Sequence, residues 1–410
     1  MSAWVYATSA GSPVWAKSDV IPVPIAGTSV TSADPEGRTQ VRARGTYTAK
    51  NMWLNVTAVT GTLTFVDRKN GAAGGQSLSI TTTGTKEDTS GTTSLSAATP
   101  DLYNLQGTMS GTHGDTATVI MFAVLLDDGA VGSALWMTGR PAGTTTNTGL
   151  ATADFVPLSG YTGITWTTTE AKAQLVVRQA VIVSNIAFNL TANTYADTTT
   201  WRFRNNGANG NQAISVAAAS TGWKEDTVAT DSVVAGDLIC GGRDAGGVSG
   251  SARIPTVEIT TSGTTRVMSS SATLGVAITA TAYSTLTENL STNATESNLQ
   301  VKVRVADTFS NLQSYVSANT RSDDSTVDFR AGAASPGGGP SISIASSSTG
   351  LKEDNTGSYV TAATDLINFR TLIGGGSGTL TLTTIGVQQG VGVGFFPPWP
   401  PRSPFPHVAM

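Results

Sequence analysis

A six-residue pattern, Thr-Gly-x-Lys-Glu-Asp, occurs three times in this chain and limits its fold more than any other feature. The copies begin at Thr83, Thr221 and Thr349. Their glycines lie 138 and then 128 residues apart. That spacing is too long for the units of a solenoid or propeller, which run about 20–50 residues, and it matches a whole small domain of about 100–150 residues. The 410-residue chain is therefore predicted to contain three similar domains in tandem.

Two further patterns recur in the same order and fix the register of the repeats. In one, a Gln stands four residues before an Arg, at Gln40, Gln174 and Gln300, and an Asn follows each Arg after seven positions. In the other, an Asp-Leu pair follows the Lys-Glu-Asp pattern after 13, 11 and 11 residues. Tandem duplication of one fold accounts for an order that never changes.

The residues around these patterns favour strands over helices. After Gln40 the chain alternates between apolar and polar residues, and the other two copies do the same, which is typical of a half-buried antiparallel strand. Asn70-Gly71 and Asn206-Gly207 follow strand-like segments and predict hairpin turns. Charged residues make up only 13% of the chain, and no segment has a convincing amphipathic helical pattern. We predict an all-β chain of three tandem antiparallel β-sandwich domains, jelly-roll-like, with extended arms at both ends.

The repeat anchors suggest a division of the chain. We assign residues 1–37 to an extended N-terminal arm, 38–170 to the first repeat, 171–296 to the second, 297–392 to a shortened third and 393–410 to a tail rich in proline and aromatic residues. Because the third repeat is short, one hypothesis is that the N-terminal arm, or that of a neighbouring subunit, completes it by strand addition.

Both predicted arms carry large aromatic residues among prolines. Exposed aromatic side chains are costly in water, so we expect these arms to dock on a partner within an assembly. The alternative for the C-terminal segment is a disordered tail. The candidate docking residues are Trp4, Tyr6 and Trp15 at the N-terminus, and Phe395, Phe396, Trp399 and Phe405 at the C-terminus.

Charge and composition exclude several partners. The net charge of −4 provides no basic surface for a phosphate backbone, so no direct contact with nucleic acid is expected. The most apolar window, 117–126, is too short to span a membrane as a helix. The N-terminus lacks the pattern of a secretory signal, which favours synthesis in a cytoplasm. The single cysteine, Cys240, allows no intrachain disulfide.

The Lys-Glu-Asp turn is the best candidate for a repeated site. Two carboxylates beside a glycine turn could contribute to calcium binding. The alternative, which we favour, is a structural turn whose Asp accepts backbone N–H groups and whose Lys pairs locally. No catalytic, cofactor-binding or metal site is expected, since His113 and Cys240 lack the partners that such sites need. The residues of the repeated structural turn are Gly84, Lys86, Glu87 and Asp88; Gly222, Lys224, Glu225 and Asp226; and Gly350, Lys352, Glu353 and Asp354.

These patterns support a resemblance to a known class of proteins. A glycine-rich loop, a short strand, Thr-Gly-x-Lys-Glu-Asp and then Ala-Gly-Asp-Leu-Ile at residues 235–239 resemble the β-sandwich units of tailed-bacteriophage virion proteins, especially capsid decoration (cement) proteins and fibres. The resemblance implies a non-enzymatic virion protein, made in the host cytoplasm, whose partners are other virion proteins such as a major capsid protein, with self-association. Many cement proteins are trimers of single jelly rolls, so three tandem copies could imitate such a trimer or stack as a rod.

Two other functions remain open. The chain could be a carbohydrate- or receptor-binding adhesin or tail fibre that uses Trp201 and Trp223 as sugar platforms. An aromatic residue that recurred at one repeat position would support this, but Thr85 and Leu351 stand where Trp223 does. An enzyme is the third class considered.

Overall fold

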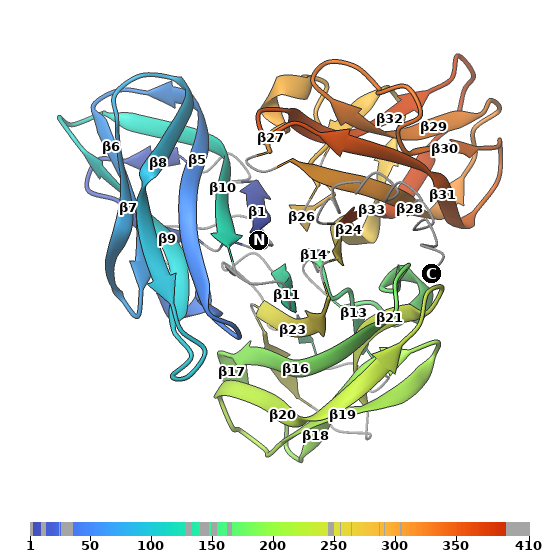
Figure 1. The fold of residues 1–410 in the computed structure, drawn as a ribbon, viewed down its shortest axis with the longest axis horizontal. Helices are drawn as coiled ribbons and strands as arrows, with labels where there is room; N and C mark the ends of the chain where they lie inside the picture. Colours follow the sequence, from blue (N-terminus) through green and yellow to red (C-terminus); the bar gives the residue numbers. More distant parts are fainter. Residues whose placement is uncertain are drawn as a thin grey trace, which may run out of the picture.

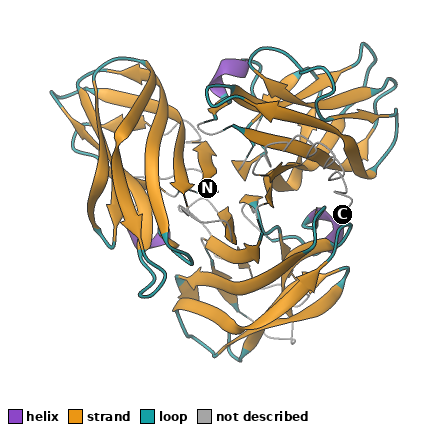
Figure 2. Ribbon diagram, viewed as in Figure 1, coloured by secondary structure: helices purple, strands orange, loops and turns teal. Residues whose placement is uncertain are grey.

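The computed structural model describes most of the chain. The described residues are 3–9, 14–23, 25, 36–127, 133–139, 147–148, 154–161, 166–244, 250–254, 256–263, 265–286, 288–290, 292–303 and 306–390. Within these ranges the chain is built of strands and three short 3-10 helices (Figure 2). The prediction of an all-β protein is confirmed.

The strands form three lobes that lie at the corners of a triangle (Figure 1). We define unit 1 as residues 3–127, unit 2 as 133–262 and unit 3 as 265–390, according to which strands pair with one another. Each unit is a sandwich of two sheets.

In unit 1, one sheet has the strand order β1-β10-β5-β8 and the other the order β3-β9-β6-β7, with β2 beside β10 and β4 beside β9. The 3-10 helix η1 (Glu36–Arg38) precedes β4. The strands are β1 (Ala3–Ser9), β2 (Val14–Ala16), β3 (Val20–Val23), β4 (Val41–Arg42), β5 (Tyr47–Val59), β6 (Thr62–Lys69), β7 (Ala72–Ile80), β8 (Gly84–Leu95), β9 (Leu102–Ser110) and β10 (Thr116–Asp127).

Unit 2 repeats this plan with the sheets β14-β11-β23-β16-β20 and β13-β21-β18-β19, and β15 beside β21. A small extra sheet has the order β12-β22-β17. The elements are β11 (Ser133–Gly139), β12 (Asn147–Thr148), β13 (Asp154–Val156), β14 (Gly160–Tyr161), η2 (Glu170–Lys172), β15 (Leu175–Val176), β16 (Val181–Leu190), β17 (Ala192–Asn193), β18 (Thr199–Asn205), β19 (Ala208–Val216), β20 (Gly222–Val233), β21 (Leu238–Asp244), β22 (Ser251–Arg253) and β23 (Thr256–Ser262).

Unit 3 has the sheets β26-β24-β33-β28-β31 and β25-β32-β29-β30, with β27 beside β32. The elements are β24 (Thr265–Ile278), β25 (Ala282–Ser284), β26 (Glu288–Asn289), η3 (Glu296–Asn298), β27 (Val301–Lys302), β28 (Asp307–Asn319), β29 (Ser325–Ala331), β30 (Ser341–Ile344), β31 (Gly350–Thr361), β32 (Leu366–Ile373) and β33 (Leu380–Gly390).

The three units share one topology. When the eight main strands of a unit are numbered along the chain, the two sheets read 1-8-3-6 and 2-7-4-5, and neighbouring strands are antiparallel. This is the strand order of a jelly roll, in which two Greek keys close into a sandwich. The predicted jelly-roll-like sandwich is therefore present three times.

The pairing corrects the predicted division of the chain. β1, β2 and β3 lie within the predicted arm 1–37, yet they pair with β10 and β9 of unit 1. In the same way β11 and β24 join the units that follow them in the sequence. The Gln-Arg pattern therefore marks the middle of each unit, and the strands before it carry no repeated sequence that would reveal them. Unit 3 lacks no strand, because β24 fills the place of β1.

The repeated Asn has a backbone role. Asn51, Asn185 and Asn311 adopt φ values of 54°, 54° and 53°. Each lies where the register shifts between paired strands, which marks a β-bulge. Asn tolerates this left-handed conformation better than other residues with side chains. The fixed Arg-to-Asn spacing therefore reflects a bulge that bends the same strand in each unit.

Trp15 belongs to the core of unit 1 and not to a docking arm. Its side chain is 0% exposed. Its ring meets Phe65 and Phe122 edge to face, with centroids 6.3 Å apart in both contacts. The side chains of Trp4 and Tyr6, on β1, and the whole of Phe395, Phe396, Trp399 and Phe405 lie outside the described residues.

Replacing Trp15 with Ala tests this assignment. Because the change leaves a cavity between two aromatic rings, we expect W15A to lower the free energy of unfolding by about 3–5 kcal/mol, measured by denaturant titration followed by circular dichroism. Val14, the neighbouring residue of β2, is 57% exposed and supplies the control. V14A is expected to change the free energy by less than about 0.5 kcal/mol. Equal, small effects of both changes would contradict a core role for Trp15.

Candidate functional site: the junctions between units

The Lys and Gly of the repeated turn act within their own unit. The glycines 84, 222 and 350 have φ values of 94°, 88° and 84°, a conformation that favours glycine at the turn. Lys86 Nζ lies 2.7 Å from Thr82 Oγ1, and Lys224 Nζ lies 2.6 Å from Ser220 Oγ. These lysines close the turn that precedes their strand.

The Asp of the turn links the two sheets of its unit. Asp88 Oδ1 accepts the backbone N–H groups of Ser90 and Gly91, at 3.0 and 2.8 Å, and Asp88 Oδ2 accepts that of Ser77 on β7, at 2.8 Å. Asp226 and Asp354 accept three backbone N–H groups in the same arrangement.

These hydrogen bonds also set the ionisation of the three aspartates. Burial acts to raise the pKa of each carboxyl, but the N–H donors outweigh it, so that all three pKa values lie below the ordinary value. The carboxylates stay charged and bonded to their own unit.

The Glu of the turn points to a different unit. Glu87 Oε1 lies 2.9 Å from Lys302 Nζ of unit 3. Glu225 pairs with both Arg42 and Arg44 of unit 1, and its Oε2 lies 3.0 Å from Arg42 Nη1. In the repeated turn, therefore, the Asp bonds within its own unit and the Glu binds a cation of another unit.

The remaining Glu completes a closed cycle. Glu353 of unit 3 pairs with Arg178 of unit 2. Unit 1 therefore docks on unit 2, unit 2 on unit 3, and unit 3 on unit 1. The cations come from the segment after each Gln of the second repeated pattern. We call this segment the docking strand: β4 with residues 43–44, β15 with residues 177–178, or β27 with residue 303. Because the docking strand and the receiving Glu lie on different surfaces, the contact is head-to-tail, and it closes into a ring after three steps.

The 3-10 helices and the receiving strands make a second set of contacts in the same cyclic order. Asn55 Nδ2 of unit 1 donates to Ser297 O in η3 of unit 3, at 3.2 Å. Asn189 Nδ2, at the matching position of unit 2, donates to Gly37 O in η1 of unit 1, at 2.7 Å.

The first junction, between units 1 and 2, contains a buried carboxyl. Glu258 on β23 is 0% exposed. Its Oε1 accepts the backbone N–H of Arg42 at 2.8 Å, and its Oε2 lies 3.8 Å from Arg44 Nε. Burial raises the pKa of Glu258 to about 7, and Glu225 adds to this, although the charges of Arg44 and Arg42 and the Arg42 N–H oppose it.

The second junction, between units 2 and 3, is held by an amide. Gln313 on β28 is 3% exposed. Its Oε1 accepts the N–H of Val176 at 2.8 Å, and its Nε2 donates to the Val176 carbonyl at 3.1 Å. A further hydrogen bond joins the same two units: Ser269 Oγ of unit 3 donates to Ser159 O of unit 2, at 2.8 Å.

The third junction, between units 3 and 1, is apolar. Trp53, Met121 and Leu125, on the outer face of the unit 1 sheet, are 0–3% exposed. They belong to the same buried cluster as Leu299 and Val303 of unit 3. Hydrophobic burial therefore supplements the Lys302–Glu87 pair at this junction.

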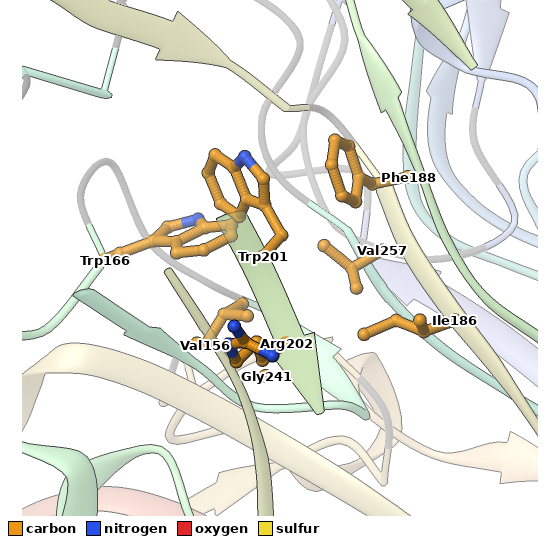
Figure 3. Close-up of a pocket in the computed structure, with 9 residues that line it drawn as sticks. Val156, Trp166, Ile186, Phe188, Trp201, Arg202, Gly241 and Val257 are labelled. Carbon is orange, nitrogen blue, oxygen red and sulfur yellow. The ribbon is translucent and has the colours of Figure 1, made fainter. Parts of the chain in front are cut away.

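The pocket drawn in Figure 3 lies inside unit 2 and is small. It encloses about 10 Å³, roughly the room of one water molecule, between Trp166, Trp201 and Phe188 on one side and Val156 and Gly241 on the other. Its lining is almost entirely apolar. This is a packing void between the two sheets and offers no room for a substrate.

The two tryptophans proposed as sugar platforms are occupied by the fold. Trp201 is 3% exposed and meets Trp166 edge to face at 4.7 Å. The Arg42 guanidinium of unit 1 lies over the ring of Trp223, 5.5 Å from its centroid. Trp223 thus takes part in the first junction.

Metal and membrane signals are absent within the described residues. Those ranges hold no group of three or more His, Cys, Asp or Glu side chains placed to bind a metal ion. None of the helices described there has the length and apolarity to cross a bilayer. Comparison with known protein families and with curated proteins finds no match for this chain.

Sequence reasoning missed the residues that give each junction its character. Glu258, Gln313 and Trp53 belong to no repeated pattern, because the matching positions differ from unit to unit. One signal was available. The two strongly repeated patterns carry charges of opposite sign: a Glu in one, and an Arg or Lys in the other. Such a pair is expected where the same two surfaces meet at every junction of a ring.

Charge reversal tests the closing contact. We expect K302E and E87K each to lower the free energy of unfolding by about 0.5–1 kcal/mol, because each places like charges at the third junction. The double variant restores the opposite charges and should recover most of the loss in a double-mutant cycle by denaturant titration. The coupling should shrink in high salt. Strictly additive effects of the two changes would contradict the contact.

Glu258 gives the first junction a defined pH dependence. Since its folded pKa of about 7 lies above the ordinary 4.5, its contribution to stability is complete below about pH 4.5 and is lost as the pH rises through 7. Between pH 5.5 and 8.5 the wild type should therefore lose about 2 kcal/mol relative to E258Q, which cannot ionise. Denaturant titrations at both pH values measure this. A difference between the two proteins that does not change with pH would contradict the assignment.

Proposed function

We propose that this chain is a non-enzymatic structural protein of a virus particle, of the capsid decoration (cement) type, in which one chain builds the shape of a trimer. The observation that carries the proposal is the closed ring. The repeated Glu residues, together with Lys302, Arg42, Arg44 and Arg178, join jelly rolls to one another. The most strongly repeated side chains therefore serve assembly.

The triangular arrangement supports this type over a rod. Many cement proteins are trimers of single jelly rolls, and a fused ring of three such folds presents a similar outline (Figure 1). The partners under this proposal are a major capsid protein and further copies of the chain, without direct contact to nucleic acid or membrane, and the location is the virion.

The adhesin alternative receives less support. Its candidate sugar platforms, Trp201 and Trp223, are a core residue of unit 2 and a residue under Arg42 at the first junction. A sugar stacks on an aromatic face that is open to solvent. Trp201 is buried and offers no such face, and Arg42 covers one face of the half-buried Trp223.

Association with particles tests the proposal. An antibody against the purified chain is used on density-gradient fractions of particles from the virus that encodes the sequence. We expect the chain to sediment with the particles in a fixed ratio to the major capsid protein. Cryo-electron microscopy of the same fraction should show three-lobed density on the particle surface.

A ring variant serves as the control for this experiment. R178E places a like charge beside Glu353 and should reduce binding of added chain to particles that lack it, provided that the intact ring is the bound form. A chain that stays at the top of the gradient and binds immobilised glycans would overturn the proposal in favour of an adhesin.

A further inference from the structure

The docking strands are edge strands with one side facing the neighbouring unit. Within unit 1, the Ala43 N–H donates to Asp101 O at 2.8 Å, and in unit 2 the Val177 N–H donates to Asp237 O at 2.9 Å. The residue before each of these, Arg42 or Val176, has its N–H turned outward. An unpaired N–H on a strand edge needs an acceptor when it is buried.

The neighbouring unit supplies that acceptor from a side chain, and the two polar junctions do so in different ways. At the first junction the acceptor is Glu258 Oε1 on β23, and at the second it is Gln313 Oε1 on β28. Both distances are 2.8 Å. Arg42 and Val176 hold matching positions in their docking strands, but the side chain that accepts their N–H groups comes from a different strand of the receiving sheet in each case: from the eighth main strand, β23, in unit 2 and from the third, β28, in unit 3.

The positions that face these acceptors are small. Glu258 is paired across the sheet with Ala187, and Gln313 with Gly386. A Cβ atom at Gly386 would lie 3.3 Å from Gln313 Cγ, closer than an ordinary contact. One long side chain and one small residue therefore share the space, and the long one comes from β23 in unit 2 and from β28 in unit 3.

The third receiving surface, on unit 1, also combines one large residue with one small residue, but the large one is apolar. There Trp53 on β5 is paired with Ala123 on β10. The large residue again faces a small one, and it contributes apolar area in place of a hydrogen-bond acceptor.

We infer that each of these cross-strand pairs is the recognition element of its junction, and that Ala187–Glu258 and Gln313–Gly386 are interchangeable ways of binding the outward amide of an incoming docking strand. Each surface binds a docking strand of the same chain: unit 2 binds that of unit 1, unit 3 binds that of unit 2, and unit 1 binds that of unit 3. The two solutions differ in one respect. A Gln captures the amide without charge, whereas Glu258 adds a carboxyl that needs a proton or the two arginines of unit 1.

Transplanting one pair into the other junction tests this. In the full-length chain, E258G removes the acceptor from the first junction, and A187Q/E258G installs the pair of the second. Hydrogen exchange by mass spectrometry follows the segment 40–46, which contains the Arg42 amide. The segment 174–180, with the Val176 amide, serves as the internal control because the second junction is unchanged.

We expect E258G to speed exchange of the segment 40–46 about tenfold, the effect of losing one buried hydrogen bond. A187Q/E258G should return the rate to within about threefold of the wild type, and the control segment should not change. Rates at each pH are divided by the intrinsic exchange rate of the unfolded segment at that pH, which gives a protection factor. The wild type should lose protection of the segment 40–46 between pH 5.5 and 8.5, because Glu258 ionises in this range. A187Q/E258G should show the same protection factor at both pH values, because its acceptor cannot ionise.

Each outcome decides the inference. If A187Q/E258G exchanges as fast as E258G, or if its protection factor changes with pH as that of the wild type does, the pairs are not interchangeable and the inference is overturned. If E258G alone unfolds, the double variant carries the test, because the inference requires it to be folded and protected. A double variant that is unfolded overturns it as well.

Discussion

The ring rests on one docking arrangement used three times, in which the docking strand of one unit lies on a sheet of the next and its cation pairs with the Glu of the repeated turn. Glu87, Glu225 and Glu353 each receive a different unit. A head-to-tail contact of this kind either continues as a filament or closes, and the rotation between these units closes it at three. The triangular arrangement of the units (Figure 1) and the burial of the docking-strand amides follow from that closure.

Fusion of the units in one chain lets the junctions differ. A homotrimer must use the same residues at every interface, but a single gene can change each copy separately. The junctions here combine a common ion pair with a carboxyl at Glu258, an amide at Gln313 and an indole at Trp53. We therefore expect the first junction to respond to pH, whereas the second relies on neutral hydrogen bonds and the third on apolar burial. Such a ring keeps the outline of a trimer although its three junctions differ in chemistry.

Much of the fold could be predicted from the sequence. The alternating strands and the Gly turns are local features, and each has a local physical cause. The repeated Asn fixed the register of the repeats, but only the structure showed that it forms a β-bulge. The boundaries of the units could not be predicted. The first strand of each unit, β1, β11 or β24, carries no repeated motif. We therefore placed the start of each repeat at its Gln-Arg pattern, which in the structure lies in the middle of a unit. The prediction that Trp15 belongs to a docking arm was wrong because the proline-rich sequence around it resembles an extended arm. In the structure its ring packs against Phe65 and Phe122 in the core of unit 1.

The sequence by itself determined that one antiparallel sandwich is present three times, because backbone patterns with a period of two and glycine turns are written along the chain. It also determined which charged residues recur. Only the tertiary structure decided what those residues contact. Glu225 and Arg44 are 181 residues apart in the chain, and their meeting depends on how whole units are rotated against one another. No local pattern encodes that rotation. It follows from the combined fit of each docking strand on the surface of another unit, such as the surface that Trp53 and Ala123 form in unit 1 or the one that Ala187 and Glu258 form in unit 2.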